Sequence, residues 1–163
     1  ENPMSLRISR RRISFALIIA STYALLTVLL GPFSYSWLQV RISEALTPLP
    51  YLFGVSAVLG LTPGVVIANV FSPIGLPDLV FGPTLTLLAA VLSWRLNFGR
   101  RSMACLYPVV VNAFGVSAYI AGFYGVPYEV GVLSIGVGEF IAVFLLGYPL
   151  LRAIERVEWS PDT

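Results

Sequence analysis

The stretch 13–30, ISFALIIASTYALLTVLL, contains eighteen residues and no charged side chain. An α-helix rises ~1.5 Å per residue, so this stretch is about long enough to cross a hydrocarbon core ~30 Å thick. Further charge-free runs lie at 79–94, 102–128 and 140–151. The sequence therefore predicts an all-α integral membrane protein.

The composition agrees with this class, because 57% of the 163 residues are hydrophobic, 11% are charged and the mean hydropathy is +0.85. The chain has ten arginines, no lysine and no histidine, and its one cysteine is Cys105. Since metal and haem ligands are mostly His, Cys and Met, we expect no metal site and no cofactor. An intramembrane enzyme would have only Ser, Thr or carboxylates for catalysis, so no catalytic residues are assigned.

Loop charge indicates how many helices cross. The segment 45–70 reads as one long span or as two short ones, because prolines and glycines interrupt it. If it is two, nine of the ten arginines lie on one side, as the positive-inside rule expects for the cytoplasm. We therefore predict one domain, residues 1–163, in the plasma membrane with both termini cytoplasmic. Its six helices are expected at about 13–30, 44–54, 56–71, 78–97, 103–123 and 131–152.

The second of these helices is too short to cross, because about eleven residues reach only ~16 Å. We expect the preceding segment, 31–43, to enter the membrane without being helical, as a re-entrant first outer loop. Such backbone is tolerated at depth only where it is buried in protein or lines a cavity. A turn at 61–64, with Thr62 as N-cap and Pro63 at the first helical position, is an alternative boundary.

Polar side chains gather in the half of the membrane opposite the arginine clusters. The stretch QVRISE (39–44) supplies Gln39, Arg41 and Glu44. An unsatisfied polar group inside a membrane costs from about 1 to a few kcal/mol, and a charge ~2.5 kcal/mol or more. We therefore predict an outward-facing cavity. Its ligand-binding residues are Arg41, Glu44, Asn69 at the end of the third helix, Asp78 at the start of the fourth, Asn112 in the fifth and Glu139 in the sixth.

These residues also have simpler structural interpretations. Arg41 and Glu44, three residues apart, can form an ion pair at a helix start. Asn112 can join packed helices, and Asp78 can cap the helix that it begins. Glu139 has the weakest alternative of this kind, because an isolated acid at its depth is functional by default.

The chemistry of the set favours a ligand that donates hydrogen bonds. Three acids accompany one arginine, so we expect a ligand that is rich in N–H groups or carries a cation. Nucleotide phosphates and nucleic acid are not expected, since Arg41 is the only basic residue predicted on this side. The aromatic residues of the outer loops either stack on a flat ring or form an interfacial belt, and they are Phe33, Tyr35, Trp37, Tyr124 and Tyr128.

The first helix carries a smooth face of small residues, Ala16, Ala20 and Ala24, at i, i+4 and i+8. Such faces let membrane helices approach one another closely. We expect this face either to dock another subunit or to pack inside its own bundle.

Four strings carry a resemblance to a known family. They are VRISEALTPLPYLFG (40–54), ANVFSPIGLPDLVFG (68–82), VVNAFGV (110–116) and SIGVGEF (134–140). Over nearly its whole length the chain resembles the queuosine-precursor substrate-binding subunit (S-component, QueT-like) of prokaryotic energy-coupling factor (ECF) transporters.

The resemblance implies a six-helix, non-enzymatic subunit that captures a deazaguanine base from outside and passes it through the lipid membrane. It implies as partners a transmembrane T-component and two cytoplasmic ATPase subunits. In this family an alanine-rich face on the first helix meets the T-component, and Ala16, Ala20 and Ala24 match that face.

The resemblance also implies roles for the predicted ligand-binding residues. A guanine-like edge offers a ring N–H and an exocyclic amine side by side, which a carboxylate accepts in two bonds. We expect this edge on Glu139. The other assignments are Asn112 and Asn69 on the remaining ring atoms, Glu44 or Asp78 on an aminomethyl cation, and Arg41 on a carboxylate or ring carbonyl.

Two alternative functions remain open at this point. An S-component for another vitamin or nucleobase has the same architecture. An autonomous small-molecule transporter needs a polar path that continues to the inner side, where the predicted helices are almost wholly apolar.

Overall fold

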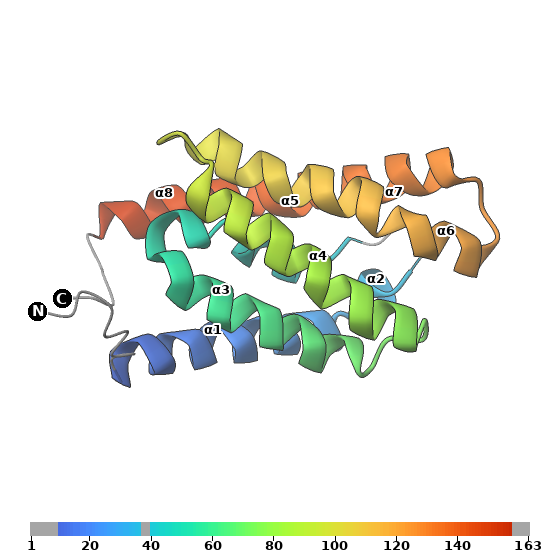
Figure 1. The fold of residues 1–163 in the computed structure, drawn as a ribbon, viewed down its shortest axis with the longest axis horizontal. Helices are drawn as coiled ribbons and strands as arrows, with labels where there is room; N and C mark the ends of the chain where they lie inside the picture. Colours follow the sequence, from blue (N-terminus) through green and yellow to red (C-terminus); the bar gives the residue numbers. More distant parts are fainter. Residues whose placement is uncertain (1–9, 37–39, 158–163) are drawn as a thin grey trace, which may run out of the picture.

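The computed structural model describes residues 10–36 and 40–157, which form a bundle of helices aligned roughly along one direction (Figure 1). In chain order, the elements are α1 (Arg10–Leu29), α2 (Gly31–Ser34), the 3-10 helix η1 (Ile42–Leu46), α3 (Pro50–Asn69), α4 (Leu76–Arg95), α5 (Arg101–Gly115), α6 (Ser117–Tyr124), α7 (Tyr128–Phe140), the π-helix η2 (Ile141–Gly147) and α8 (Tyr148–Arg156).

Four helical runs are long and apolar enough to cross a membrane. They are α1, α3, α4 and the continuous 29-residue run from α7 to α8. The helices α5 and α6, bent by 42° at their junction, make a fifth span if they are counted as one. The all-α, membrane-spanning class is confirmed, whereas the predicted count of six helices is not.

The second predicted helix, 44–54, is not a separate helix. Its residues form η1, a turn and the first residues of α3. Within α3 the helix is broken at Gly54, whose φ of 51° and ψ of −131° are not helical. A side chain there would also force Trp94 to shift, since a Cβ on Gly54 would lie 2.9 Å from Trp94 Nε1.

Although no long helix lies between α1 and α3, the packing of these two helices shows that the chain passes along the bundle once between them. The two helices run parallel, because Gly60 lies against Ala16 and Gly64 lies one turn further on, against Ala20. Two parallel neighbours require the connecting chain to return along the bundle, and the described part of this connection, residues 35–36 and 40–49, does so (Figure 1). The chain therefore traverses the bundle once more than its helices do. A re-entrant loop is not confirmed, because this segment continues to the other end.

The returning segment is covered by its own protein. Ser43, Glu44 and Ala45 are buried, and Gly147 of η2 approaches so closely that a Cβ on it would lie 2.8 Å from the Ala45 carbonyl oxygen. Irregular backbone needs such cover inside a membrane, where no water is present to satisfy its N–H and C=O groups. The returning segment, which contains η1, is thus an internal part of the bundle.

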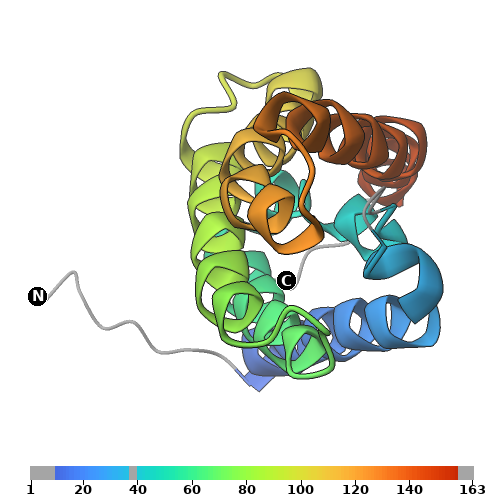
Figure 2. The same cartoon turned by 90° about the vertical axis from the view of Figure 1, so that its right-hand side faces the viewer.

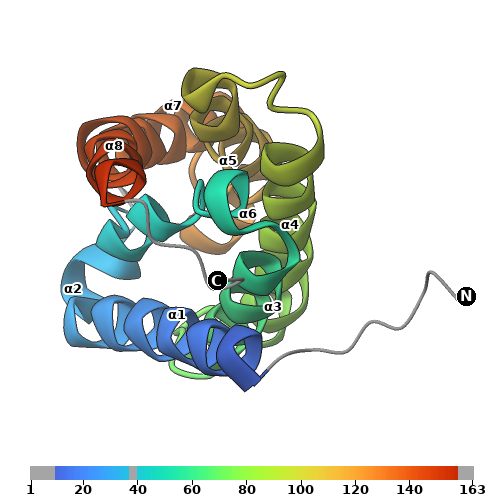
Figure 3. The ribbon, with the colours of Figure 1, turned by 90° about the vertical axis from the view of Figure 1, so that its left-hand side faces the viewer.

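The arginines mark one end of the bundle. Among the described residues, every arginine except Arg41 lies where α1 and α5 begin or where α4 and α8 end. Figure 3 faces this arginine end, and Figure 2 faces the opposite end, where α2 and the α3–α4 and α6–α7 connections lie. At the arginine end, Arg101 Nε donates to Glu155 Oε2 at 2.7 Å, which joins α5 to α8.

Candidate functional site

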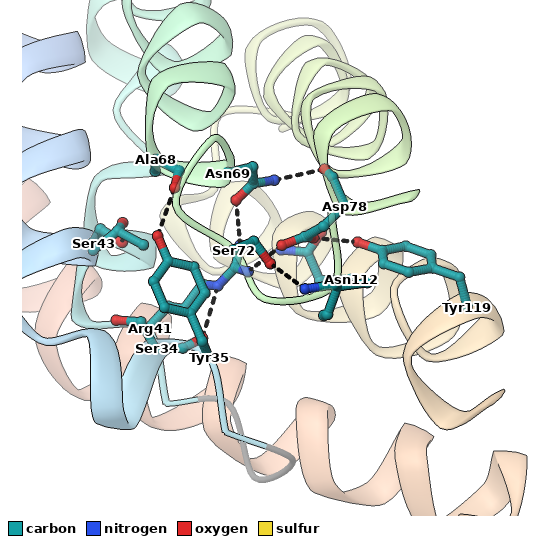
Figure 4. Close-up of polar contacts among 12 residues, drawn as sticks. Ser34, Tyr35, Arg41, Ser43, Ala68, Asn69, Ser72, Asp78, Asn112 and Tyr119 are labelled. Atoms are coloured by element: carbon teal, nitrogen blue, oxygen red, sulfur yellow. Dashed lines mark hydrogen bonds and ion pairs between the residues drawn. The ribbon is translucent and has the colours of Figure 1, made fainter. Parts of the chain in front are cut away.

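Arg41 and Asp78 form a buried ion pair in the half of the bundle opposite the arginine end. Arg41 precedes η1 and is 6% exposed, while Asp78 lies in the first turn of α4 and is fully buried. Arg41 Nη2 lies 3.1 Å from Asp78 Oδ2, and the Tyr119 hydroxyl of α6 donates to Asp78 Oδ1 at 2.8 Å (Figure 4). Both carboxylate oxygens of Asp78 therefore have a donor within the protein.

Asn69 extends this pair into a network. Its Nδ2 donates to the backbone carbonyl of Asp78 at 2.7 Å, and its Oδ1 lies 3.4 Å from Arg41 Nη1 (Figure 4). Gly82 makes room for the amide, because a Cβ there would collide with Nδ2. Arg41 Nε donates to the Ser34 carbonyl at 3.1 Å. We call Ser34, Arg41, Asn69, Asp78 and Tyr119 the Arg41 network, which joins α2, α3, α4 and α6 to the returning segment.

A second polar group lies where η1 meets α1. The Tyr23 hydroxyl donates to Glu44 Oε1. The neighbouring Thr27 Oγ1 lies 2.6 Å from Ser43 Oγ and donates to the Tyr23 carbonyl at 2.9 Å. Tyr23 is fully buried and Glu44 is 2% exposed, yet Glu44 Oε2 has no hydrogen-bond partner among residues 10–36 and 40–157.

A third polar group joins α5 to α7. Asn112 Nδ2 donates to Glu139 Oε1 at 3.0 Å. Glu139 Oε2 has no partner in the described part of the chain, although the residue is only 5% exposed. Glu139 is close enough to Glu44 and Arg41 for their charges to interact. The two acids thus share one arrangement, in which Oε1 is held by a neutral donor and Oε2 is open.

Open acceptors of this kind point to a ligand. Most buried polar atoms in folded proteins have a partner, and leaving one without costs about 1–3 kcal/mol. Besides the two glutamates, the hydroxyls of Ser34 and Ser117 are buried without a partner in the described part of the chain. A donor-rich ligand is the kind of molecule that satisfies the two carboxylate oxygens.

All six predicted ligand-binding residues are buried. The simpler interpretation of Arg41 and Glu44 as an ion pair is wrong, because Arg41 pairs with Asp78. Asp78 makes no side-chain cap on α4 and instead accepts from Arg41 and Tyr119. Asn112 does join two packed helices, as one interpretation proposed, and its partner is Glu139. Gln39 lies outside the described residues.

The aromatic residues of the predicted outer loops differ in their exposure and contacts. Tyr35 donates to the Ala68 carbonyl at 2.6 Å, its ring lies 5.5 Å from the Arg41 guanidinium carbon, and the Tyr124 hydroxyl donates to its carbonyl. Phe33 and Tyr128 are exposed, and Trp37 lies outside the described residues. Tyr35 and Tyr124 therefore support the start of the returning segment.

Sequence reasoning missed two tyrosines of the site, Tyr23 and Tyr119. Both lie in apolar runs. Tyrosine counts there as a hydrophobic residue, so its hydroxyl was overlooked as a polar group. The available signal was the hydroxyl itself, because a tyrosine buried in an apolar span usually has a hydrogen-bond partner.

The alanine face of α1 packs inside the chain's own bundle. Ala20 and Ala24 are buried, and Ala16 and Ala20 contact Gly60 and Gly64 of α3. This is the second of the two uses that the sequence left open. Docking of another subunit on this face stays a prediction.

Comparison with known proteins assigns the chain to a family. A family model described as QueT transporter matches residues 13–156, which is most of the chain. No curated protein and no solved structure matches. The match confirms the resemblance and, together with the apolar helices, indicates a membrane protein that transports a small molecule rather than an enzyme. The chain belongs to the QueT transporter family.

Proposed function

We propose that this chain is the substrate-capture subunit of an ECF-type importer and binds a queuosine precursor, a 7-deazaguanine base such as the aminomethyl form. The observation that carries the proposal is the pair of open carboxylate oxygens, Glu44 Oε2 and Glu139 Oε2, buried in one bundle. The family match supports the transport role.

The charge distribution supports capture from outside. The arginine end is assigned to the cytoplasm by the positive-inside rule, which places both described chain ends, Arg10 and Val157, on that side. The Arg41 network then lies toward the outside. A prokaryotic plasma membrane is the membrane in which such an importer acts.

The hydrogen bonds already made suggest which residues bind the base. Glu139 Oε2 is open for the ring N–H and exocyclic amine, and Asn112 holds the same carboxylate. Glu44 suits an aminomethyl cation better than Asp78 does, because both Asp78 oxygens already have donors. For the same reason Arg41 and Asn69 are assigned to the shape of the site rather than to the ligand.

Binding of aminomethyl-deazaguanine to the purified protein in detergent, measured by calorimetry, tests the proposal. We expect nanomolar to low-micromolar affinity for this base and no binding of riboflavin, with guanine bound more weakly because it lacks the cation. Failure of folded protein to bind any deazaguanine at millimolar ligand would contradict the proposed substrate. Tight binding of riboflavin instead would favour an S-component for another vitamin.

Replacing Glu139 with glutamine is expected to weaken binding of the base about 10- to 100-fold, because it exchanges an acceptor for a donor at the guanine-like edge. Calorimetric titration measures this change. Glu129→Gln is the matched control, since Glu129 lies exposed in the first turn of the same helix. Equal affinities for the wild type and Glu139→Gln would remove Glu139 from the site.

The proposed T-component and two ATPase subunits are tested by uptake. Cells that express the chain with these partners are expected to accumulate labelled base, and cells that express the chain alone are not. Accumulation by the chain alone, against a concentration gradient, would favour the autonomous transporter.

A further inference from the structure

The feature that carries this inference is the buried hydrogen bond between Tyr23 and Glu44. We propose that Tyr23 is a positioning residue that makes the site selective for ligands with a cationic substituent. It holds Glu44 as a charged acceptor through Oε1 and leaves Oε2 for the cation. This inference rests on the proposed function and names the chemical form of the substrate.

The geometry around Glu44 supports a positioning role. Glu44 lies in η1, where its N–H donates to the Arg41 carbonyl and its carbonyl accepts from Thr47 N–H. Three side-chain contacts add to this: Tyr23 to Glu44, Thr27 to Ser43 at 2.6 Å, and Thr47 Oγ1 to the Glu44 carbonyl at 2.7 Å. Tyr23 makes the one of these contacts that reaches the carboxylate, and it comes from α1, a long helix packed along α3.

The charges of the site favour a cationic ligand. Among the described residues, Arg41 is the only basic residue away from the arginine end, and its ion pair is with Asp78. Its charge also reaches Glu44 and Glu139, but neither of these acids forms an ion pair among the described residues. A buried carboxylate is stable only with a cation or with enough hydrogen bonds. A ligand that carries one ammonium group and one N–H edge satisfies both acids, whereas a neutral ligand satisfies one.

The Tyr23 hydroxyl determines whether Glu44 is ready for this ligand. The Tyr23 hydroxyl donates to Oε1, and Oε2 has no partner among the described residues, so the carboxylate is held at one oxygen and open at the other. Phenylalanine at position 23 would keep the ring and remove this donor. Glu44 would then be buried without the Tyr23 donor, which makes a negative charge on it more costly to hold. The counter-charge for an ammonium group would be lost, while contacts of the ring edge with Glu139 would stay.

The test compares two bases that differ in charge at one substituent. Wild type, Tyr23→Phe and Glu44→Gln are titrated with aminomethyl-deazaguanine, a cation, and with cyano-deazaguanine, which is neutral. We expect both variants to bind the aminomethyl base about 10- to 100-fold more weakly and the cyano base within about 3-fold of wild type. Tyr107→Phe is the matched control, since it also removes a bonded phenol hydroxyl, the one that donates to the Leu96 carbonyl near the arginine end.

The ratio of the two affinities separates the possible outcomes. A purely structural role for Tyr23 would weaken both bases alike, and that result would overturn the inference while the proposed function stood. If the wild type bound neither base, the proposed function would fail and the inference with it. If Tyr23→Phe did not fold, as judged by helicity and gel filtration, Glu44→Gln would still report the ratio. An unchanged ratio in that variant would equally overturn the inference.

Discussion

Replacing Asp78 with alanine is expected to lower the free energy of unfolding by about 3–5 kcal/mol, because it leaves the Arg41 guanidinium buried without its counter-charge. The pair is 3.1 Å apart and both side chains are buried. The Tyr119 hydroxyl loses its acceptor in the same change. Unfolding of the purified protein in mixed detergent micelles, followed by circular dichroism, measures the loss.

The exposed ion pair at the arginine end provides the control. Arg101 and Glu155 are about one-third exposed, so Glu155→Gln is expected to change stability little. A double variant, Arg41→Met with Asp78→Leu, is expected to recover much of the loss, because apolar side chains often replace a buried pair without cost. If Asp78→Ala were no more harmful than Glu155→Gln, the Arg41 network would not stabilise the fold.

The Arg41 network and the two open glutamates are expected to respond in opposite ways. Loss of Asp78 affects stability first and binding as a consequence, because the network ties the returning segment to α4 and α6. Glu139 carries an open oxygen, so Glu139→Gln is expected to reduce binding without reducing stability. Sites built for a ligand commonly cost the free protein some stability. Measuring both quantities in both variants therefore separates support of the fold from contact with the ligand.

Two of the helical spans were predictable from charge. The expected spans 13–30 and 78–97 correspond to α1 and α4 within about three residues, since long charge-free runs leave few alternatives. The second pass was not predictable in this way. Residues 44–54 are apolar enough for a helix, but the parallel packing of α1 and α3 decides their path, and contacts between distant residues are not visible in a single sequence.

The burial of the six candidate residues was predictable from the sequence, whereas their contacts were not. The energetic cost of polar groups in a membrane identified six buried side chains, from Arg41 to Glu139. It did not indicate that Arg41 pairs with Asp78, 37 residues away, rather than with Glu44. Nor did it identify Tyr23, whose hydroxyl is one atom on a largely apolar side chain. Pairing depends on the fold, whereas burial follows from composition.

Replacing Gly60 with valine is expected to destabilise the protein by about 3 kcal/mol or more, at the upper limit of what overpacking costs. Even a Cβ at this position would lie 2.7 Å from the Ala16 carbonyl oxygen and 2.8 Å from Ile19 Cβ. The first of these atoms is backbone and cannot rotate away. Close packing of small residues holds membrane helices together where no hydrophobic force acts between them. The same unfolding assay measures the effect.

Gly122→Val is the control for the Gly60 variant, because a Cβ on Gly122 has nothing within 4 Å. Equal stabilities of the two variants would show that contact between α1 and α3 is not limiting for stability.

The Gly60 change is also expected to affect ligand affinity. Tyr23 lies on the same face of α1, where a Cβ on Gly64 would lie 3.2 Å from Tyr23 Cβ. Moving α1 away from α3 would carry the Tyr23 hydroxyl with it, so any folded fraction of the variant is expected to lose affinity for the aminomethyl base more than for the cyano base.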